Sequence, residues 1–85
     1  MTITLLYFAR VRELAGVSEE TVHLPELVRD VAGLLAWLKA RGPNFAAALG
    51  EGARIRVAVN LDEAGPEVRL KSGDEVAIFP PVTGG

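Results

Sequence analysis

The chain has 85 residues, 49% of them hydrophobic, which is enough for one small domain with a single core. It has no cysteine and one histidine, which excludes disulfide bonds, iron–sulfur ligation and a thiol nucleophile and argues against a structural zinc site. The formal net charge of −2 gives no electrostatic reason to bind nucleic acid or acidic lipid.

No stretch of the chain approaches the run of about eighteen apolar residues that a membrane helix needs. Residues 1–6 carry neither the basic region nor the cleavage pattern of a signal peptide. We therefore expect a cytoplasmic protein that does not bind membranes.

The first third of the chain predicts two strands that pair as a hairpin. Residues 2–8 are rich in β-branched and aromatic residues, and residues 20–24 alternate between apolar and polar side chains. Between them, residues 9–16 are charged and end in glycine, which predicts a loop with a turn.

A helix is predicted next. Its apolar stripe has helical spacing and consists of Val31, Leu34, Leu35 and Leu38. Asp30 is expected to cap its first turn, and Gly42 with Pro43 is expected to end it. Asn44 is expected to cap a short second helix that runs through Leu49.

The remaining residues predict three more strands. Residues 54–60 alternate clearly, residues 67–70 predict a short strand, and residues 75–79 predict the last strand after a turn at residues 72–74. The order of elements predicts an α+β protein with the β-grasp, or ubiquitin-like, fold: a mixed sheet of about five strands, one main helix and a short second helix. Residues 1–79 would form the domain and residues 80–85 an extended tail.

The tail combines a stiff beginning with a narrow end. Pro80 and Pro81 fix φ and remove two backbone donors, so the last strand must stop and the chain must leave the domain in an extended form. Gly84 and Gly85 have no side chains, so the terminal carboxylate can enter a narrow active site. We expect the tail, including Val82 and Thr83, to insert into a partner and Gly85 to carry the reaction.

The strand alternation also predicts an uncovered apolar face opposite the main helix. Its residues are Leu6, Phe8, Ala58, Ala77 and Phe79. Two aromatic side chains on such a face favour a partner surface that holds the root of the tail. The alternative is that they are ordinary edge residues, or that residues 61–69 cover them.

The other candidate residues offer no catalytic constellation and no site for a bound metal or cofactor. Arg10, Arg12, Arg54 and Arg56 form either a basic patch for an ATP-dependent partner or a solvated face paired with acids such as Glu13. His23 is expected to be a solvated surface residue.

Three segments resemble a known family. They read FARVRELAG from Phe8 to Gly16, VAVN from Val57 to Asn60, and GDEVAIFPPVTGG from Gly73 to Gly85. They are similar to the small subunit of molybdopterin synthase, the MoaD-type sulfur carriers, over essentially the whole chain.

The resemblance implies a non-catalytic sulfur donor. An ATP-dependent adenylyltransferase would adenylate the carboxylate of Gly85, which would then become a thiocarboxylate. The tail would insert into the large catalytic subunit, in an assembly of two small and two large subunits, and give its sulfur to a cyclic pterin phosphate precursor of the molybdenum cofactor. Aromatic residues at the positions of Phe8 and Phe79 would contact both partners.

Three other functions remain open from the residues themselves. A β-grasp sulfur carrier could serve thiamine synthesis or tRNA thiolation, a ubiquitin-like modifier could form an isopeptide bond with a lysine, and a plain interaction domain could end in Gly-Gly by accident. The lead-in to the tail and the FARVRE motif favour the pterin role.

Overall fold

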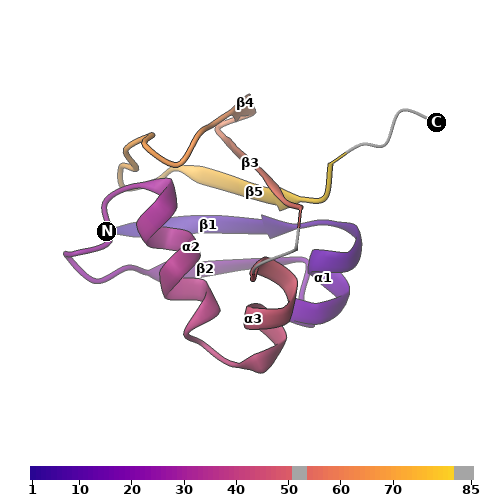
Figure 1. Ribbon diagram of the computed structural model, residues 1–85. Coiled ribbons are helices and arrows are strands. Elements are labelled where there is room, and N and C mark those ends of the chain that lie inside the picture. Colours follow the sequence, from indigo (N-terminus) through magenta and orange to yellow (C-terminus); the bar gives the residue numbers. More distant parts are fainter. Residues whose placement is uncertain (51–53, 82–85) are drawn as a thin grey trace.

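A five-stranded mixed sheet with helices against one face forms the domain in the computed structural model, which describes residues 1–50 and 54–81 (Figure 1). The strands are β1 (Thr2–Tyr7), β2 (Glu19–His23), β3 (Arg56–Val59), β4 (Asp62–Glu63) and β5 (Glu75–Phe79). The helices are α1 (Ala9–Ala15), α2 (Val31–Lys39) and α3 (Pro43–Leu49).

The sheet has the strand order β2–β1–β5–β3–β4. As predicted, β1 and β2 form an antiparallel hairpin. Strand β5 lies in the middle, parallel to β1 and antiparallel to β3. This is the β-grasp fold that the order of elements predicts. The tail therefore leaves the sheet at the end where β1 also ends and β3 begins.

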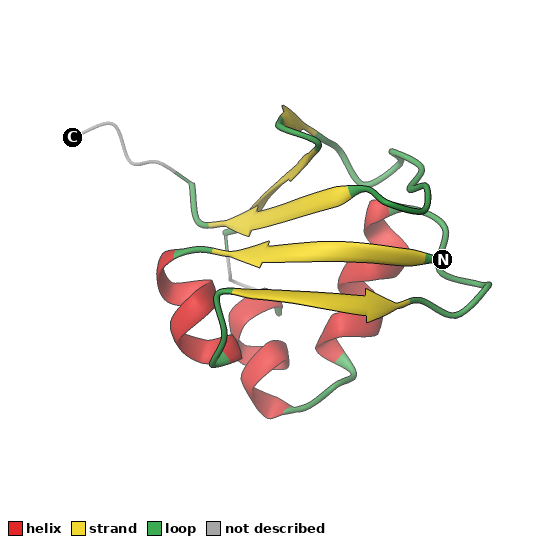
Figure 2. Ribbon diagram, turned by 180° about the vertical axis from the view of Figure 1, so that it is seen from behind, coloured by secondary structure: helices red, strands yellow, loops and turns green. Residues whose placement is uncertain are grey.

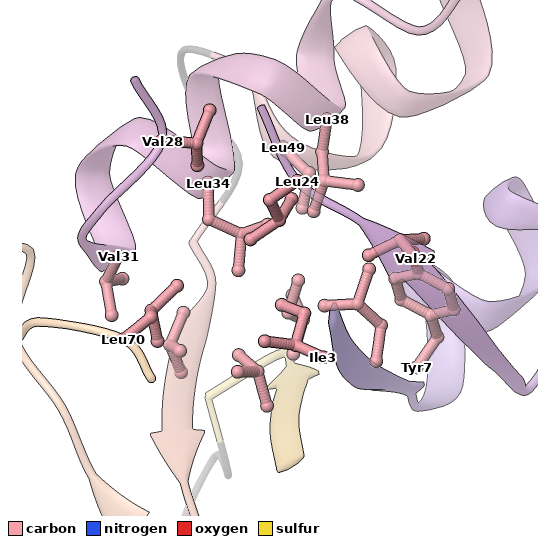
Figure 3. Packing of buried hydrophobic residues seen from close by; sticks show 14 of the residues in the cluster. Ile3, Tyr7, Val22, Leu24, Val28, Val31, Leu34, Leu38, Leu49 and Leu70 are labelled. Atoms are coloured by element: carbon pink, nitrogen blue, oxygen red, sulfur yellow. The ribbon is translucent and has the colours of Figure 1, made fainter. Parts of the chain in front are cut away.

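The core lies between the sheet and the helices (Figure 3). Its most completely buried side chains are Tyr7, Ile3, Leu5, Leu34, Leu38, Ile78, Val31 and Val76. Burial of each of these side chains stabilises the fold by about 1.5 to 3 kcal/mol relative to exposure. The predicted cap of α2 is present, since a carboxylate oxygen of Asp30 accepts a 2.8 Å hydrogen bond from the N–H of Gly33.

Residues 9–15 are helical, so the prediction of a loop there is wrong. Helix α1 has no side-chain cap at its start, and it is held instead by packing, because Val11 is buried and the helix lies against α3 and β5. Gly16 ends the helix with a φ of 85°, and its N–H donates to the carbonyl of Arg12 at 2.9 Å.

The prediction of a short strand late in the chain is also wrong. Residues 67–70 form no strand beyond an isolated bridge between Arg69 and Asp30. The short strand is β4, joined to β3 by Asn60 and Leu61, whose positive φ values of 50° and 74° are typical of a type I′ turn.

The cap of the third helix is not the predicted residue, because α3 already begins at Pro43. Gly42 precedes α3 and Pro43 occupies its first turn, so Asn44 is not the cap. In the part of the chain that the structure describes, no helix has both the length and the apolar character needed to cross a bilayer.

Candidate functional site

The open face of the sheet carries the predicted apolar residues in two adjacent rows. Figure 2 shows this face, with α2 and α3 behind the sheet. In the first row, Leu6 lies opposite Ala77 across β1 and β5, and Ala77 lies opposite Ala58 across β5 and β3. All three side chains are half-buried. The sequence alternation placed them correctly on one face.

The second row contains the two aromatic residues. Tyr7 pairs with Ile78, so Phe8 and Phe79 follow as neighbours at the end of the parallel pair. The N–H of Phe8 donates to the carbonyl of Ile78 at 3.2 Å, which holds the end of β1 to β5. Phe8 is 47% exposed and Phe79 is half-buried.

The segment after β4 does not cover this face. Strand β4 extends the sheet beside β3. The following residues lie against the start of α2, where the N–H groups of Val31 and Ala32 donate to the carbonyls of Val68 and Pro66, both at 3.0 Å. Among residues 1–50 and 54–81, nothing therefore covers the open face between β2 and β3.

Charged residues border the apolar rows. Arg56 lies opposite Phe79 and forms an ion pair with Glu63 on β4, not with Glu13. Arg10 and Arg12 are exposed on α1, and they make no side-chain hydrogen bond or ion pair with any other described residue. Of the four predicted arginines, Arg56 is the one that forms an ion pair with another described residue.

The tail begins directly beside the aromatic row. Pro80 and Pro81 are half-buried and follow Phe79 at the end of β5. Val82, Thr83, Gly84 and Gly85 lie outside the described residues, so the insertion of the tail and the reaction at Gly85 remain predictions.

A polar network on the opposite side of the sheet was not predicted from the sequence. The hydroxyl of Tyr7 donates to Glu20 at 2.5 Å, and Arg41 forms a 2.8 Å ion pair with the same carboxylate. The guanidinium of Arg41 also lies 5.4 Å from the ring centre of Trp37 and 4.8 Å from that of Phe45. This network ties β1 and β2 to the helices.

Burial and the contacts within the network shift the pKa values of Tyr7 and Glu20. Burial, followed by the hydrogen bond to Glu20, raises the pKa of Tyr7 above its ordinary value. Burial alone would raise the pKa of Glu20, but hydrogen bonds from Arg41 and Tyr7 and the charge of Arg41 outweigh it and lower the pKa. Because its groups face the helices, we assign the network to stability.

His23 lies at the surface, as predicted, with its Nδ1 atom 2.7 Å from the hydroxyl of Thr2. Within residues 1–50 and 54–81, no cluster of three potential metal ligands occurs.

The strand order, with helices against one face of the sheet, defines the class of β-grasp, or ubiquitin-like, proteins. Residues 5–85 match the ThiS family, and the chain belongs to this family.

Individual relatives agree with this family. A molybdopterin synthase sulfur carrier subunit from Chlamydomonas reinhardtii is 42% identical over 100% of both chains. A molybdopterin converting factor subunit 1 from Pyrococcus furiosus is similar in structure, with a TM-score of 0.80, 38% identity and coverage of 96% of this chain and 99% of that one. The H. volcanii small archaeal modifier protein 1 has a TM-score of 0.79 at 27% identity, with coverage of 95% and 98%.

Proposed function

We propose that this chain is a sulfur carrier of molybdenum cofactor biosynthesis and serves as the small subunit of a molybdopterin synthase. Membership of the ThiS family over residues 5–85 supports the carrier role, and the full-length match to a molybdopterin synthase sulfur carrier subunit supports the pterin pathway. In this proposal residues 1–79 are the folded body and residues 80–85 are the tail that reacts.

The proposed chemistry begins with activation of the tail. A carboxylate is a poor electrophile until one of its oxygens becomes part of a good leaving group. In an activating adenylyltransferase, the Gly85 carboxylate would attack the α-phosphorus of ATP and release pyrophosphate. A sulfur nucleophile would then displace AMP from the acyl carbon and leave a thiocarboxylate. The chain itself would bind no cofactor.

The thiocarboxylate would next be delivered to a large catalytic subunit, in an assembly of two small and two large subunits. Six residues from Pro80 to Gly85 can span about 20 Å when extended, so the tip can react deep inside the partner while the body stays outside. The catalytic groups would belong to the large subunit, and this chain would act as a covalent co-substrate that donates sulfur to the cyclic pterin phosphate.

One observation in the structure carries this proposal furthest. Phe8 and Phe79 lie side by side on the open face, and Phe79 is followed at once by Pro80. A partner that binds Leu6, Phe8, Ala58, Ala77 and Phe79 would therefore hold the root of the tail and set the direction in which it leaves. Buried aromatic contacts of this kind often dominate binding energy.

The test is reconstitution with a thiocarboxylated chain. The chain, a large subunit and the cyclic pterin precursor are mixed, and the dithiolene product is measured. We expect deletion of Gly85 to abolish product while binding to the large subunit persists. A second variant with one residue appended after Gly85 should bind equally and also fail. Full activity of either variant would contradict the proposal.

A second candidate function is protein modification, which the likeness to the H. volcanii small archaeal modifier protein 1 favours. Intact mass spectrometry separates the two. A sulfur carrier from a sulfur-replete host contains a fraction in which one oxygen of Gly85 is replaced by sulfur, whereas a modifier gives conjugates of higher mass that survive denaturation. Thiamine and tRNA thiolation are tested by replacing the pterin precursor with their acceptors.

A further inference from the structure

The arginines of the sequence meet around the exit of the tail, although they are far apart along the chain. Strand β5 lies between β1 and β3. Because β1 is parallel and β3 antiparallel to β5, β1 ends and β3 begins at the same end of the sheet at which β5 ends. Helix α1, which carries Arg10 and Arg12, follows β1 and packs against β5. Arg54 and Arg56 precede or begin β3, on the other side of β5. We call these four residues the exit arginines.

Two further contacts place Arg54 and Arg56 beside the tail. Arg56 lies opposite Phe79 in the β3–β5 pair. Both arginines also line a hollow of about 770 Å³ whose wall includes Pro81, the second residue of the tail. Figures 1 and 2 agree that α1 and the end of β5 lie at the same end of the domain. Arginines therefore lie on both sides of the root of the tail, and Glu63 pairs with one of them, Arg56.

This placement runs against the overall composition, because the chain has 11 acidic and 9 basic side chains. Three acidic residues lie towards this end of the domain. Glu63 pairs with Arg56, and Glu13 lies on α1 beside the two arginines of that helix. Glu19 lies on β2, two strands away from β5. Arg10 and Arg12 keep exposed side chains without an ion pair to another described residue. They are available to a partner.

We propose, on the basis of the function proposed above, that the exit arginines bind acidic residues on the rim of the large subunit's channel and steer the tail towards its entrance. The apolar rows supply contact area, but they do not attract a partner before contact. Charges around the tail act over about 10 Å at moderate salt, so they orient the encounter before the tail enters. Complementary charge acts mainly on the association rate, whereas the apolar face acts on dissociation.

The chain offers a matched control for this proposal. Arg29 and Arg69 are exposed arginines at the opposite end of the domain from the tail. The N–H of Leu70 donates to the carbonyl of Arg29 there. The variant Arg10→Glu, Arg12→Glu and the variant Arg29→Glu, Arg69→Glu shift the net charge of −2 by the same amount. A difference between them therefore reports position and not total charge.

The measurement is the association rate constant with the large subunit, from about 50 mM to about 500 mM NaCl. We expect the Arg10→Glu, Arg12→Glu variant to associate about tenfold more slowly at low salt, with a dissociation rate within about twofold of the original chain. The control variant should stay within about twofold in both rates, and the difference should vanish at high salt.

Thermal melts establish that the variants fold. If the glutamate variant does not fold, Arg10→Gln with Arg12→Gln removes the same positive charges and should show a smaller loss in the same direction. Equal slowing of both double variants, or an association rate of the original chain that does not change with salt, would overturn the steering role while leaving the sulfur-carrier proposal intact. Absence of any binding by the original chain would overturn both.

Discussion

Leu6 lies directly opposite Ala77 at the centre of the sheet, and Ala58 lies on the other side of Ala77. The two alanines leave the middle of the open face shallow, with Leu6 on one side and Phe79 two residues further along β5. A partner that binds this face must therefore lie close to the sheet at Ala77. Bulk added at that point should separate binding from folding.

Replacing Ala77 with arginine tests this relationship. The new side chain would extend from the open face and not into the core, so we expect the free energy of unfolding to change by less than about 0.5 kcal/mol. Binding to the large subunit should weaken at least about tenfold, or about 1.4 kcal/mol. Isothermal titration calorimetry measures the dissociation constant for the large subunit, and urea denaturation measures the free energy of unfolding. Thr21→Arg, on the same face but on β2, should bind normally; an unchanged dissociation constant for Ala77→Arg would rule out this interface.

Phe79 and Phe45 form a second matched pair. We expect Phe79→Ala to weaken binding by about 2 kcal/mol and stability by less, because this ring is half-buried beside the tail. Phe45→Ala should do the reverse and cost about 2 kcal/mol of stability, because its ring packs 6.0 Å from that of Tyr7 and against Arg41. Binding and denaturation measurements on both variants decide the matter, and the opposite pattern would contradict the assigned faces.

Glu20 makes the stability of the domain depend on pH. The pKa of its carboxyl is lower in the folded protein than its ordinary value of 4.5, because the bonds from Arg41 and Tyr7 outweigh the effect of burial. The folded state therefore holds the proton less tightly than the unfolded state. The resulting stabilisation is fully present above the ordinary pKa and is lost as the pH falls through the lowered pKa.

We expect Glu20→Gln to reduce the free energy of unfolding by about 1 kcal/mol at neutral pH, a modest value because Arg41 is partly solvated. The difference from the original chain should shrink below about pH 4.5. Urea denaturation across this range measures it. Glu13→Gln removes an exposed carboxylate and serves as the control. A difference that grows in acid would show that the sign is wrong.

Leu61 occupies a backbone conformation that a leucine rarely adopts. It has a φ of 74° in the turn between β3 and β4, and its side chain is 90% exposed. In the folded protein, left-handed backbone destabilises a residue other than glycine by about 1 to 2 kcal/mol. Glycine avoids this strain, but it loses more conformational entropy on folding, which costs about 0.5 to 1 kcal/mol. We therefore expect Leu61→Gly to stabilise the domain by about 0.5 kcal/mol.

The control for this change is Leu61→Ala, which removes the same exposed side chain but keeps the strain. Its stability should stay close to that of the original chain and below that of Leu61→Gly. Thermal denaturation of the three proteins gives the order. A glycine variant that is less stable than the alanine variant would show that the turn is not strained.

Regular side-chain patterns explain which parts of the fold could be predicted. The alternation in residues 2–8 and 75–79 located β1 and β5, and the apolar stripe with Asp30 before it located α2. Residues 9–15 misled the prediction because α1 has only two turns, three charged side chains among its seven residues and no capping side chain. Tertiary packing of Val11 makes that segment helical, and the sequence pattern does not contain that packing.

The same limit applies to contacts between distant residues. Alternation placed Leu6, Ala58 and Ala77 on one face, but their alignment in one row depends on the register of three strands. Tyr7, Glu20 and Arg41 are far apart along the chain, and no local pattern joins them. Strand β4 follows from the turn at Asn60 and Leu61, and its two residues are too few to show alternation.

The central position of β5 has a mechanical consequence. A pull on Pro80 runs along β5, which is hydrogen-bonded on both sides, to β1 and to β3. Such a load shears two ladders at once, so it cannot open the bonds one after another as it would at a sheet edge. A load applied at Pro80 would therefore have to break both ladders together before β5 could leave the domain.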